Sequence, residues 1–124
     1  MEIRISARPE LIPTVRTVAS DLAGRADFDL DAISDLRMAV DEACTTLIGF
    51  ASDDGLNCKF VLDAERIEVT VSASSVPPGA EISTDSFGWR VLQTLADEVS
   101  TLRGVDGHAD ALAIRLTKQS GVPR

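Results

Sequence analysis

The chain has few of the residues that build metal centres and nucleophilic active sites. Among 124 residues there are one histidine, two cysteines and no tyrosine. Cys44 and Cys58 form neither a CxxC motif nor a disulfide framework, so a metal site would have to use scattered carboxylates. A Ser-His-Asp or Cys-His catalytic set would have to use His108, which lies in the glycine-containing stretch VDGHAD. Such a context is typical of an exposed turn, so we expect neither zinc nor histidine-dependent catalysis.

Basic residues and long apolar runs are also scarce. The 12 lysines and arginines are outnumbered by 20 acidic residues, for a net charge of −8. This charge argues against a nucleic-acid backbone as the main ligand and favours basic protein partners. No apolar run approaches the roughly 18 residues of a membrane helix, and MEIRISARPE lacks the apolar stretch of a signal peptide. The expectation is a soluble, cytoplasmic protein that binds neither nucleic acid nor membrane.

What the chain does have is enough apolar residues, 44%, for one ordinary core. The length fits a single domain, which we place at residues 1–118, followed by a frayed tail at 119–124. Apolar periodicity predicts, in order, strand 2–7, helix 8–24, a helix within 27–51, strands 58–63 and 66–73, helix 87–99, and strands 99–104 and 110–118. This order predicts an α+β two-layer sandwich with helices on one face of a mixed, mostly antiparallel sheet.

The two longer predicted helices each have one apolar stripe. In the first the stripe contains Leu11, Val15, Val18 and Leu22, and Gly24 is the expected C-cap. Arg16 falls off this stripe and is expected to face outward.

The second predicted helix starts at a cap provided by Asp29 or Asp31. Its stripe contains Ile33, Leu36, Val40, Cys44 and Leu47. At about 100° per residue, Glu42 points nearly opposite this stripe and Thr46 follows one turn later. Asp35 and Asp41 are interpreted as part of a solvated face.

The segment LRMAVDEACTTLIGFA resembles the N-box helix of the GHKL (Bergerat-type) ATPases, and most of all that of the RsbW-type anti-sigma factors. The phrase AVDEAC followed by LADEV supports the resemblance, and the predicted elements follow the family order over nearly the whole chain. The resemblance implies a GHKL ATPase-like fold.

Site residues follow from the resemblance where positions match. Glu42 matches the glutamate that acts in kinase members as general base on a serine of an anti-anti-sigma protein. Thr46 stands where the family has a magnesium-binding asparagine. Ser86 and Gly88 stand in the G-x-G turn under the phosphates, with only the second glycine retained. Arg16 matches an arginine that contacts the sigma factor.

Other nucleotide-binding positions depart from the family pattern. Ala73, Ser75 and Pro77 replace the adenine-reading aspartate and the two glycines of its D-x-G-x-G box. The side chain of alanine cannot accept a hydrogen bond, and an unpaired buried ligand amine costs about 1–3 kcal/mol. Proline also removes an amide donor near the phosphates. We therefore expect no ATP-Mg binding or only weak binding, and little or no kinase activity.

The resemblance favours one function and leaves two alternatives. The leading interpretation is an anti-sigma factor that sequesters a stress-type sigma factor in the bacterial cytoplasm and is released by a STAS-type anti-anti-sigma protein. The alternatives are an active ATP-Mg-dependent serine kinase acting on that antagonist, and a GHKL-like scaffold for another signalling partner. Family members are commonly dimers, and the edge formed by EIRISA with its helix is the candidate contact. Cys44 is expected to be inert packing, while the orientation of Cys58 and any redox role stay open.

Overall fold

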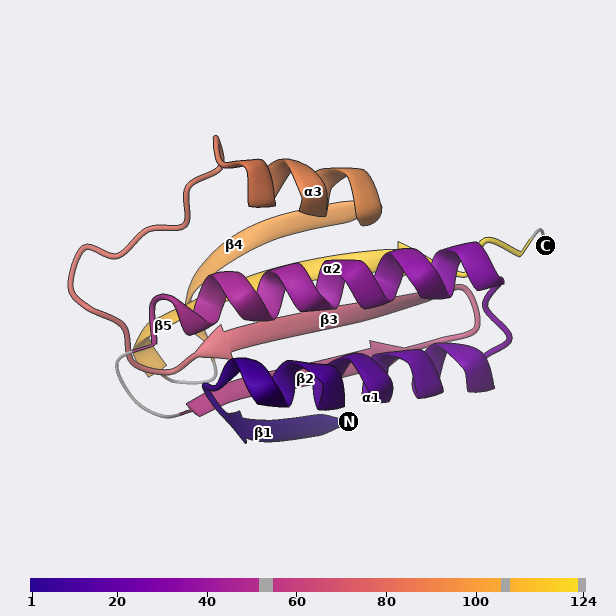
Figure 1. The fold of residues 1–124 in the computed structure, drawn as a ribbon, viewed down its shortest axis with the longest axis horizontal. Coiled ribbons are helices and arrows are strands. Elements are labelled where there is room, and N and C mark those ends of the chain that lie inside the picture. The colour runs from indigo at the N-terminus through magenta and orange to yellow at the C-terminus, as the bar shows by residue number, and fades with distance from the viewer. Residues whose placement is uncertain (52–54, 106–107, 123–124) are drawn as a thin grey trace.

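A computed structural model describes residues 1–51, 55–105 and 108–122. Three helices lie on one face of a five-stranded sheet (Figure 1). The elements in chain order are β1 (Glu2–Ser6), the 3-10 helix η1 (Pro9–Leu11), α1 (Ile12–Arg25), α2 (Leu30–Ile48), β2 (Gly55–Leu62), β3 (Arg66–Ala73), α3 (Phe87–Leu95), β4 (Glu98–Val105) and β5 (His108–Gln119). The expected α+β architecture, with helices on one face, is confirmed.

The sheet has the strand order β1-β2-β3-β5-β4, and all four pairings are antiparallel. The last strand therefore inserts between β3 and β4, while β1 and β4 form the two edges. No parallel pair occurs among the described strands, so the sheet is antiparallel throughout. None of the helices in the described part of the chain is long and apolar enough to cross a membrane.

The core lies between the sheet and the helices, and β3 runs through its centre. Ile67, Val69 and Val71 of β3 are fully buried, as their alternation with polar residues predicts. In β5, Leu116 pairs with Val69 and Ile114 pairs with Val71. Burial of each such side chain is worth about 1.5–3 kcal/mol, so this row of paired side chains fixes the register of the sheet centre.

The buried faces of α1 and α2 contain alanines that were not part of the predicted apolar stripes. On α1 the buried residues are Ile12, Val15, Ala19 and Ala23, whereas Val18 and Leu22 are only partly buried. On α2 the expected stripe is widened by Ala32, Ala39 and Ala43, and Ile33 is only partly buried. Alanines let a helix approach its neighbours closely, so the buried stripe of each helix is displaced from the one that its larger residues mark.

The connection between α1 and α2 differs from the expected C-cap. Gly24 lies inside α1, and the residue with a left-handed backbone is Asp27, with φ of 59°. Aspartate tolerates this conformation better than most residues. Of the two expected caps for α2, Asp29 is the one used, because its side chain accepts a 2.7 Å hydrogen bond from the amide of Ala32.

The third helix is shorter than expected. It ends at Leu95, and Ala96 is already extended, with φ −97° and ψ 153°. The residues after it join the sheet, where Glu98 pairs with Thr117 and Val99 with Leu116. The prediction of helix up to residue 99 was wrong because pairing with β5 overrides the local helical pattern.

Ordered contacts extend past the domain end that we expected at residue 118. Gln119 belongs to β5, and the amide of Ser120 donates to the carbonyl of Glu65 at 2.7 Å. The amide of Asp29 donates to the carbonyl of Ser120 at 2.9 Å. Ser120 is thus hydrogen-bonded both to the turn between β2 and β3 and to the segment between α1 and α2. The end of the tail at 123–124, the hairpin turn at 106–107 and the side chain of His108 lie outside the described part of the structure.

Candidate functional site

The first residues of α3 pack against α2 where the candidate base lies. A Cβ added to Gly88 would lie 3.1 Å from the Cδ of Glu42 and in direct contact with its carboxylate oxygen Oε1. Only glycine therefore leaves room at this position for Glu42 as it stands. Glu42 was expected to point nearly opposite the apolar stripe of its helix, and packing of α3 against α2 leaves it half-buried. The structure thus brings together two residues that the sequence places in separate motifs.

Ser86 is used to start α3. Its Oγ accepts a 3.1 Å hydrogen bond from the amide of Trp89 and donates one of 3.1 Å to the carbonyl of Ser83. The buried Trp89 anchors the first turn of the helix. The hydroxyl that the resemblance assigns to a phosphate is therefore engaged as an N-cap.

Thr46 lies one turn beyond Glu42 and is half-buried on α2. No group of three or more histidine, cysteine, aspartate or glutamate side chains that could hold a metal occurs among the described residues. Ala73 ends β3 and is fully buried. At the position that the resemblance assigns to adenine, the side chain is thus a methyl group.

These residues fit ATP-Mg poorly. Among the positions that the resemblance assigns to the nucleotide, Ala73 has no side-chain acceptor, and the hydroxyl of Ser86 already donates one hydrogen bond and accepts another.

Arg16 lies on the other side of α2, where α1 packs against it. Its Nη1 lies 2.9 Å from Oδ2 of Asp41, and each side chain is 33% exposed. The second oxygen of Asp41, Oδ1, is buried and has no hydrogen-bond partner within the described part of the chain. The interpretation of Asp41 as part of a solvated face was wrong, because α1 covers it. The two residues are 25 positions apart, so no local spacing indicated the pair.

Cys44 and Cys58 meet in the core. Both are fully buried, Cys44 on α2 and Cys58 on the helix-facing side of β2. The hydrogen bond between the two thiols and the burial of Cys44 raise its pKa, and the nearby charge of Asp41 raises it further. The orientation of Cys58, left open by the sequence, is toward the core.

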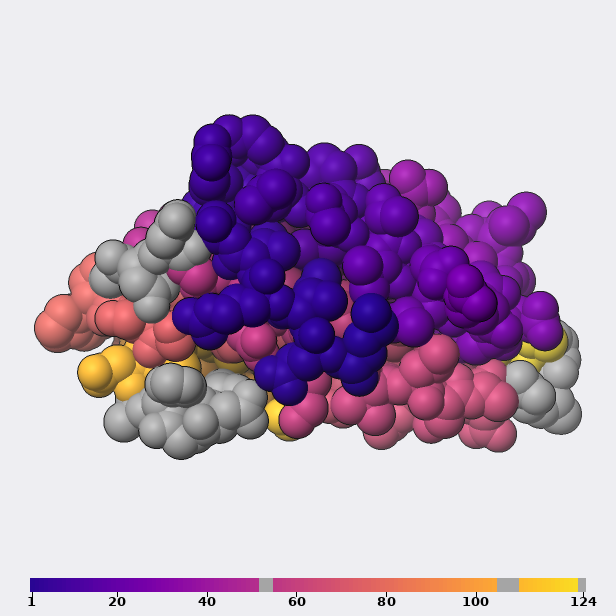
Figure 2. All heavy atoms as spheres, turned by 90° about the horizontal axis from the view of Figure 1, so that it is seen from below, coloured from indigo at the N-terminus to yellow at the C-terminus, as the bar shows by residue number. Residues whose placement is uncertain are grey.

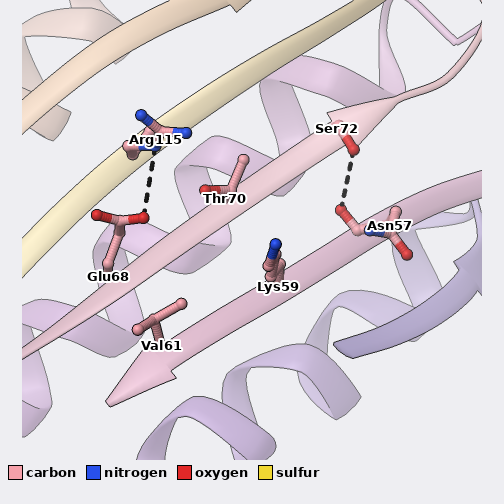
Figure 3. A pocket seen from close by; sticks show the side chains of 7 residues that line it. All are labelled: Asn57, Lys59, Val61, Glu68, Thr70, Ser72 and Arg115. Carbon is pink, nitrogen blue, oxygen red and sulfur yellow. Dashed lines mark hydrogen bonds and ion pairs between the residues drawn. The ribbon is translucent and has the colours of Figure 1, made fainter. Parts of the chain in front are cut away.

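A polar pocket lies on the opposite face of the sheet, away from the helices (Figure 3). Its volume is about 100 Å³, and Nε of Arg115 lies 3.5 Å from Oε1 of Glu68 across it. The lining residues are Asn57, Lys59, Val61, Glu68, Thr70, Ser72 and Arg115. The sheet separates this pocket from the helix-side residues that the resemblance assigns.

A second cavity, of about 290 Å³, lies where the loop after β3 crosses β4 and β5. It is lined in part by Glu81 and Arg103, and the guanidinium of Arg103 donates to the carbonyl of Ala80. Neither cavity is lined by Glu42, Thr46, Ser86 or Gly88.

Comparison with known proteins agrees with this architecture. The family model for histidine kinase-like ATPase domains matches residues 5–118. The chain is 39% identical over 102 residues to the anti-sigma-F factor RsbW of Mycobacterium tuberculosis strain H37Rv, covering 82% of this chain and 60% of that protein. It is 33% identical over 76 residues to the serine-protein kinase RsbW of Bacillus subtilis strain 168, covering 58% and 48%. The chain thus spans about half to three-fifths of these relatives.

A solved structure shares the fold. The crystal structure of the RsbU and RsbW domains of a Mycobacterium tuberculosis protein superposes with a TM-score of 0.68 at 17% identity, covering 96% of this chain and 32% of that one. At this identity the likeness concerns the fold alone. The resemblance inferred from the N-box segment is confirmed by the family match together with the 39% identical relative. The chain belongs to the family of histidine kinase-like ATPase domains, as an RsbW-type member of the GHKL superfamily.

Proposed function

We propose that this domain is an anti-sigma factor that binds and sequesters a stress-type sigma factor in the bacterial cytoplasm. A STAS-type anti-anti-sigma protein would release the sigma factor by competing for the same surface. The observation that carries the proposal is the 39% identity, over 82% of the chain, to a protein described as anti-sigma-F factor RsbW.

Arg16 is the proposed contact to both partners. It lies on the half-exposed side of α1, and the segments from the N-terminus through α1 form much of one face of the molecule (Figure 2). A guanidinium presents donors in a planar fork that suits a carboxylate of a partner. On a chain with net charge −8, such an arginine is a specific contact rather than part of a basic patch. A homodimer through the exposed edge of β1 is a further proposal, since β2 is the one neighbour of β1 among the described strands.

Release by competition needs no nucleotide. We propose little or no kinase activity because Ala73, which the resemblance places at the adenine position, has a side chain that offers no hydrogen-bond acceptor. Sigma binding would then be a simple equilibrium, and the phosphorylation state of the antagonist would be set by another enzyme. The alternative, an ATP-Mg-dependent serine kinase, is favoured by the closeness of Glu42 to Gly88 and by relatives described as serine-protein kinases. A GHKL-like scaffold for another signalling partner is the second alternative.

Copurification tests this proposal. The tagged chain is recovered from its native cell beside an Arg16→Ala variant, and the eluates are compared by mass spectrometry. A sigma factor that is present with the wild type and depleted with the variant supports the anti-sigma role and the assigned surface. Recovery of other signalling proteins without any sigma factor favours the scaffold. Phosphate transfer from ATP-Mg to a copurified STAS-type protein favours the kinase.

A further inference from the structure

Arg16 does not stand alone on its helix. The hydrogen-bonded ion pair between its Nη1 and Oδ2 of Asp41 spans 2.9 Å and links α1 to α2. Two-thirds of each side chain is covered, so the pair is shielded from solvent more than a surface salt bridge. An arginine side chain otherwise samples many rotamers, and ordering it on binding weakens affinity.

Asp41 carries a feature that fold stability alone does not explain. Its Oδ1 is buried without a hydrogen-bond partner in the described part of the chain. A buried acceptor without a partner is unfavourable, and such groups in folded proteins call for an explanation. The charge of Asp41 also reaches the core, where it contributes to the raised pKa of Cys44. A residue that served only packing at this position would have no need of a carboxylate.

Within the described part of the chain, the bond to Asp41 leaves part of the guanidinium free for a partner. Arginine has five N–H donors, and the bond to Asp41 is made by Nη1. A partner carboxylate can therefore approach another edge of the fork while Asp41 keeps its bond. The geometry favours a guanidinium that is already oriented before the partner arrives.

We propose that Asp41 is a positioning residue that holds Arg16 in the orientation needed to bind the partner. The inference rests on the proposed function, because it takes Arg16 as the contact to the sigma factor. It adds a residue of α2 to a recognition surface that the sequence places on α1 alone. Asp41 acts through Arg16 and does not itself touch the partner.

A double-mutant cycle tests the role of Asp41. The probe is the sigma factor that copurifies with the wild-type chain, and its affinity is measured by calorimetry for wild type, Asp41→Ala, Arg16→Ala and the double variant. We expect Asp41→Ala to weaken binding about fivefold by returning rotamer freedom to Arg16. In the Arg16→Ala background the same change should have less than about a twofold effect, because nothing is left to position.

Two variants separate positioning from charge and from general damage. Asp41→Asn keeps an oxygen that can accept from Arg16 and should recover most of the affinity lost in Asp41→Ala. Asp35→Ala removes the same charge from the same helix, but its partner is Lys118, 3.2 Å away, so it should leave sigma affinity unchanged. Melting curves establish that each variant is folded at the temperature of the titration.

The outcomes distinguish this inference from the function on which it rests. If no sigma factor copurifies with the wild-type chain, the anti-sigma proposal fails, and the proposed role of Asp41 fails with it. If wild type binds but Asp41→Ala and Arg16→Ala act independently, only the positioning role is overturned. Equal losses in Asp41→Ala and Asp35→Ala would also overturn it, since the effect would then be one of net charge.

Discussion

The carboxylate of Glu42 on α2 lies directly against the Cα of Gly88 in the first turn of α3. This contact gives a steric reason for a glycine at position 88, because a methyl group there would occupy the space of the carboxylate oxygen. It also places an acid at the turn where the resemblance expects phosphates.

Gly88→Ala should move the carboxylate of Glu42 at small cost to the fold. The clash involves the flexible end of Glu42, and alanine gains up to about 1 kcal/mol of helix propensity over glycine. We expect the free energy of unfolding to change by less than about 1 kcal/mol. In a Glu42→Ala background the same substitution should be stabilising, as measured by urea unfolding. A large loss in both backgrounds would show that backbone strain, and not the carboxylate, requires the glycine.

Glu42→Ala should leave sigma binding nearly unchanged. The residue is half-buried at the contact with α3, away from the pair that Arg16 makes with Asp41. Because Glu42 is half-buried and outside the apolar core, we expect its replacement to change stability by no more than about 1 kcal/mol. Calorimetry with the sigma factor and a melting curve measure both effects. Loss of phosphate transfer to an antagonist that the wild type phosphorylates would instead identify Glu42 as a working base.

ATP-Mg should bind weakly if it binds at all. The buried methyl group of Ala73 offers no acceptor to adenine, and the missing hydrogen bond lowers affinity by up to about 100-fold. Isothermal titration with magnesium present should show no saturable heat at micromolar ATP. Saturable binding that prefers ATP over GTP would restore the kinase interpretation.

Arg16→Ala should weaken sigma binding at least about tenfold, which is about 1.4 kcal/mol. Affinity for the anti-anti-sigma protein should fall as well, since both are proposed to use one surface. The same substitution should also destabilise the fold, because the half-buried Asp41 loses its ion-pair partner at 2.9 Å. We expect a loss of about 1 kcal/mol of stability, measured by chemical unfolding. Unchanged affinity for both partners would reduce Arg16 to a stabilising link between α1 and α2.

Alkaline pH should destabilise the protein through Cys44. Its hydrogen bond with Cys58 and its burial raise its pKa above the ordinary 9.0, so the folded state keeps the thiol neutral where the unfolded chain ionises. The stability due to the neutral thiol is fully present below pH 9.0 and is lost as pH rises above it. Relative to a Cys44→Ala control, wild type should lose up to about 1.4 kcal/mol per pH unit in this range.

Urea unfolding from pH 7 to 10.5 measures this difference between wild type and control. The native thiols should also resist alkylation until the protein unfolds, because both cysteines are fully buried. Rapid alkylation of native protein at neutral pH would contradict the inert role.

Local patterns in the sequence determined most of the elements. The alternation in RIEVTVSA predicted β3 with its bounds, Arg66–Ala73. The spacing of apolar residues predicted α2 and the burial of Leu36, Val40, Cys44 and Leu47. These features depend on which face of one element is apolar, so the sequence alone carries them. Membership of the RsbW-type group was likewise visible in the N-box segment, because it depends on residue identities in order.

Tertiary structure decided which side chains of different elements meet. Arg16 meets Asp41, Glu42 meets Gly88 and Cys44 meets Cys58 only because α1, α3 and β2 pack on different sides of α2. Each pair joins elements whose relative rotation is set by packing, and alanines inside the helix interfaces shifted that rotation from what the larger residues predicted. The end of α3 was decided by pairing of β4 with β5. Apolar periodicity shows which face of a helix or strand is buried. Which element packs against that face depends on close packing across the whole core.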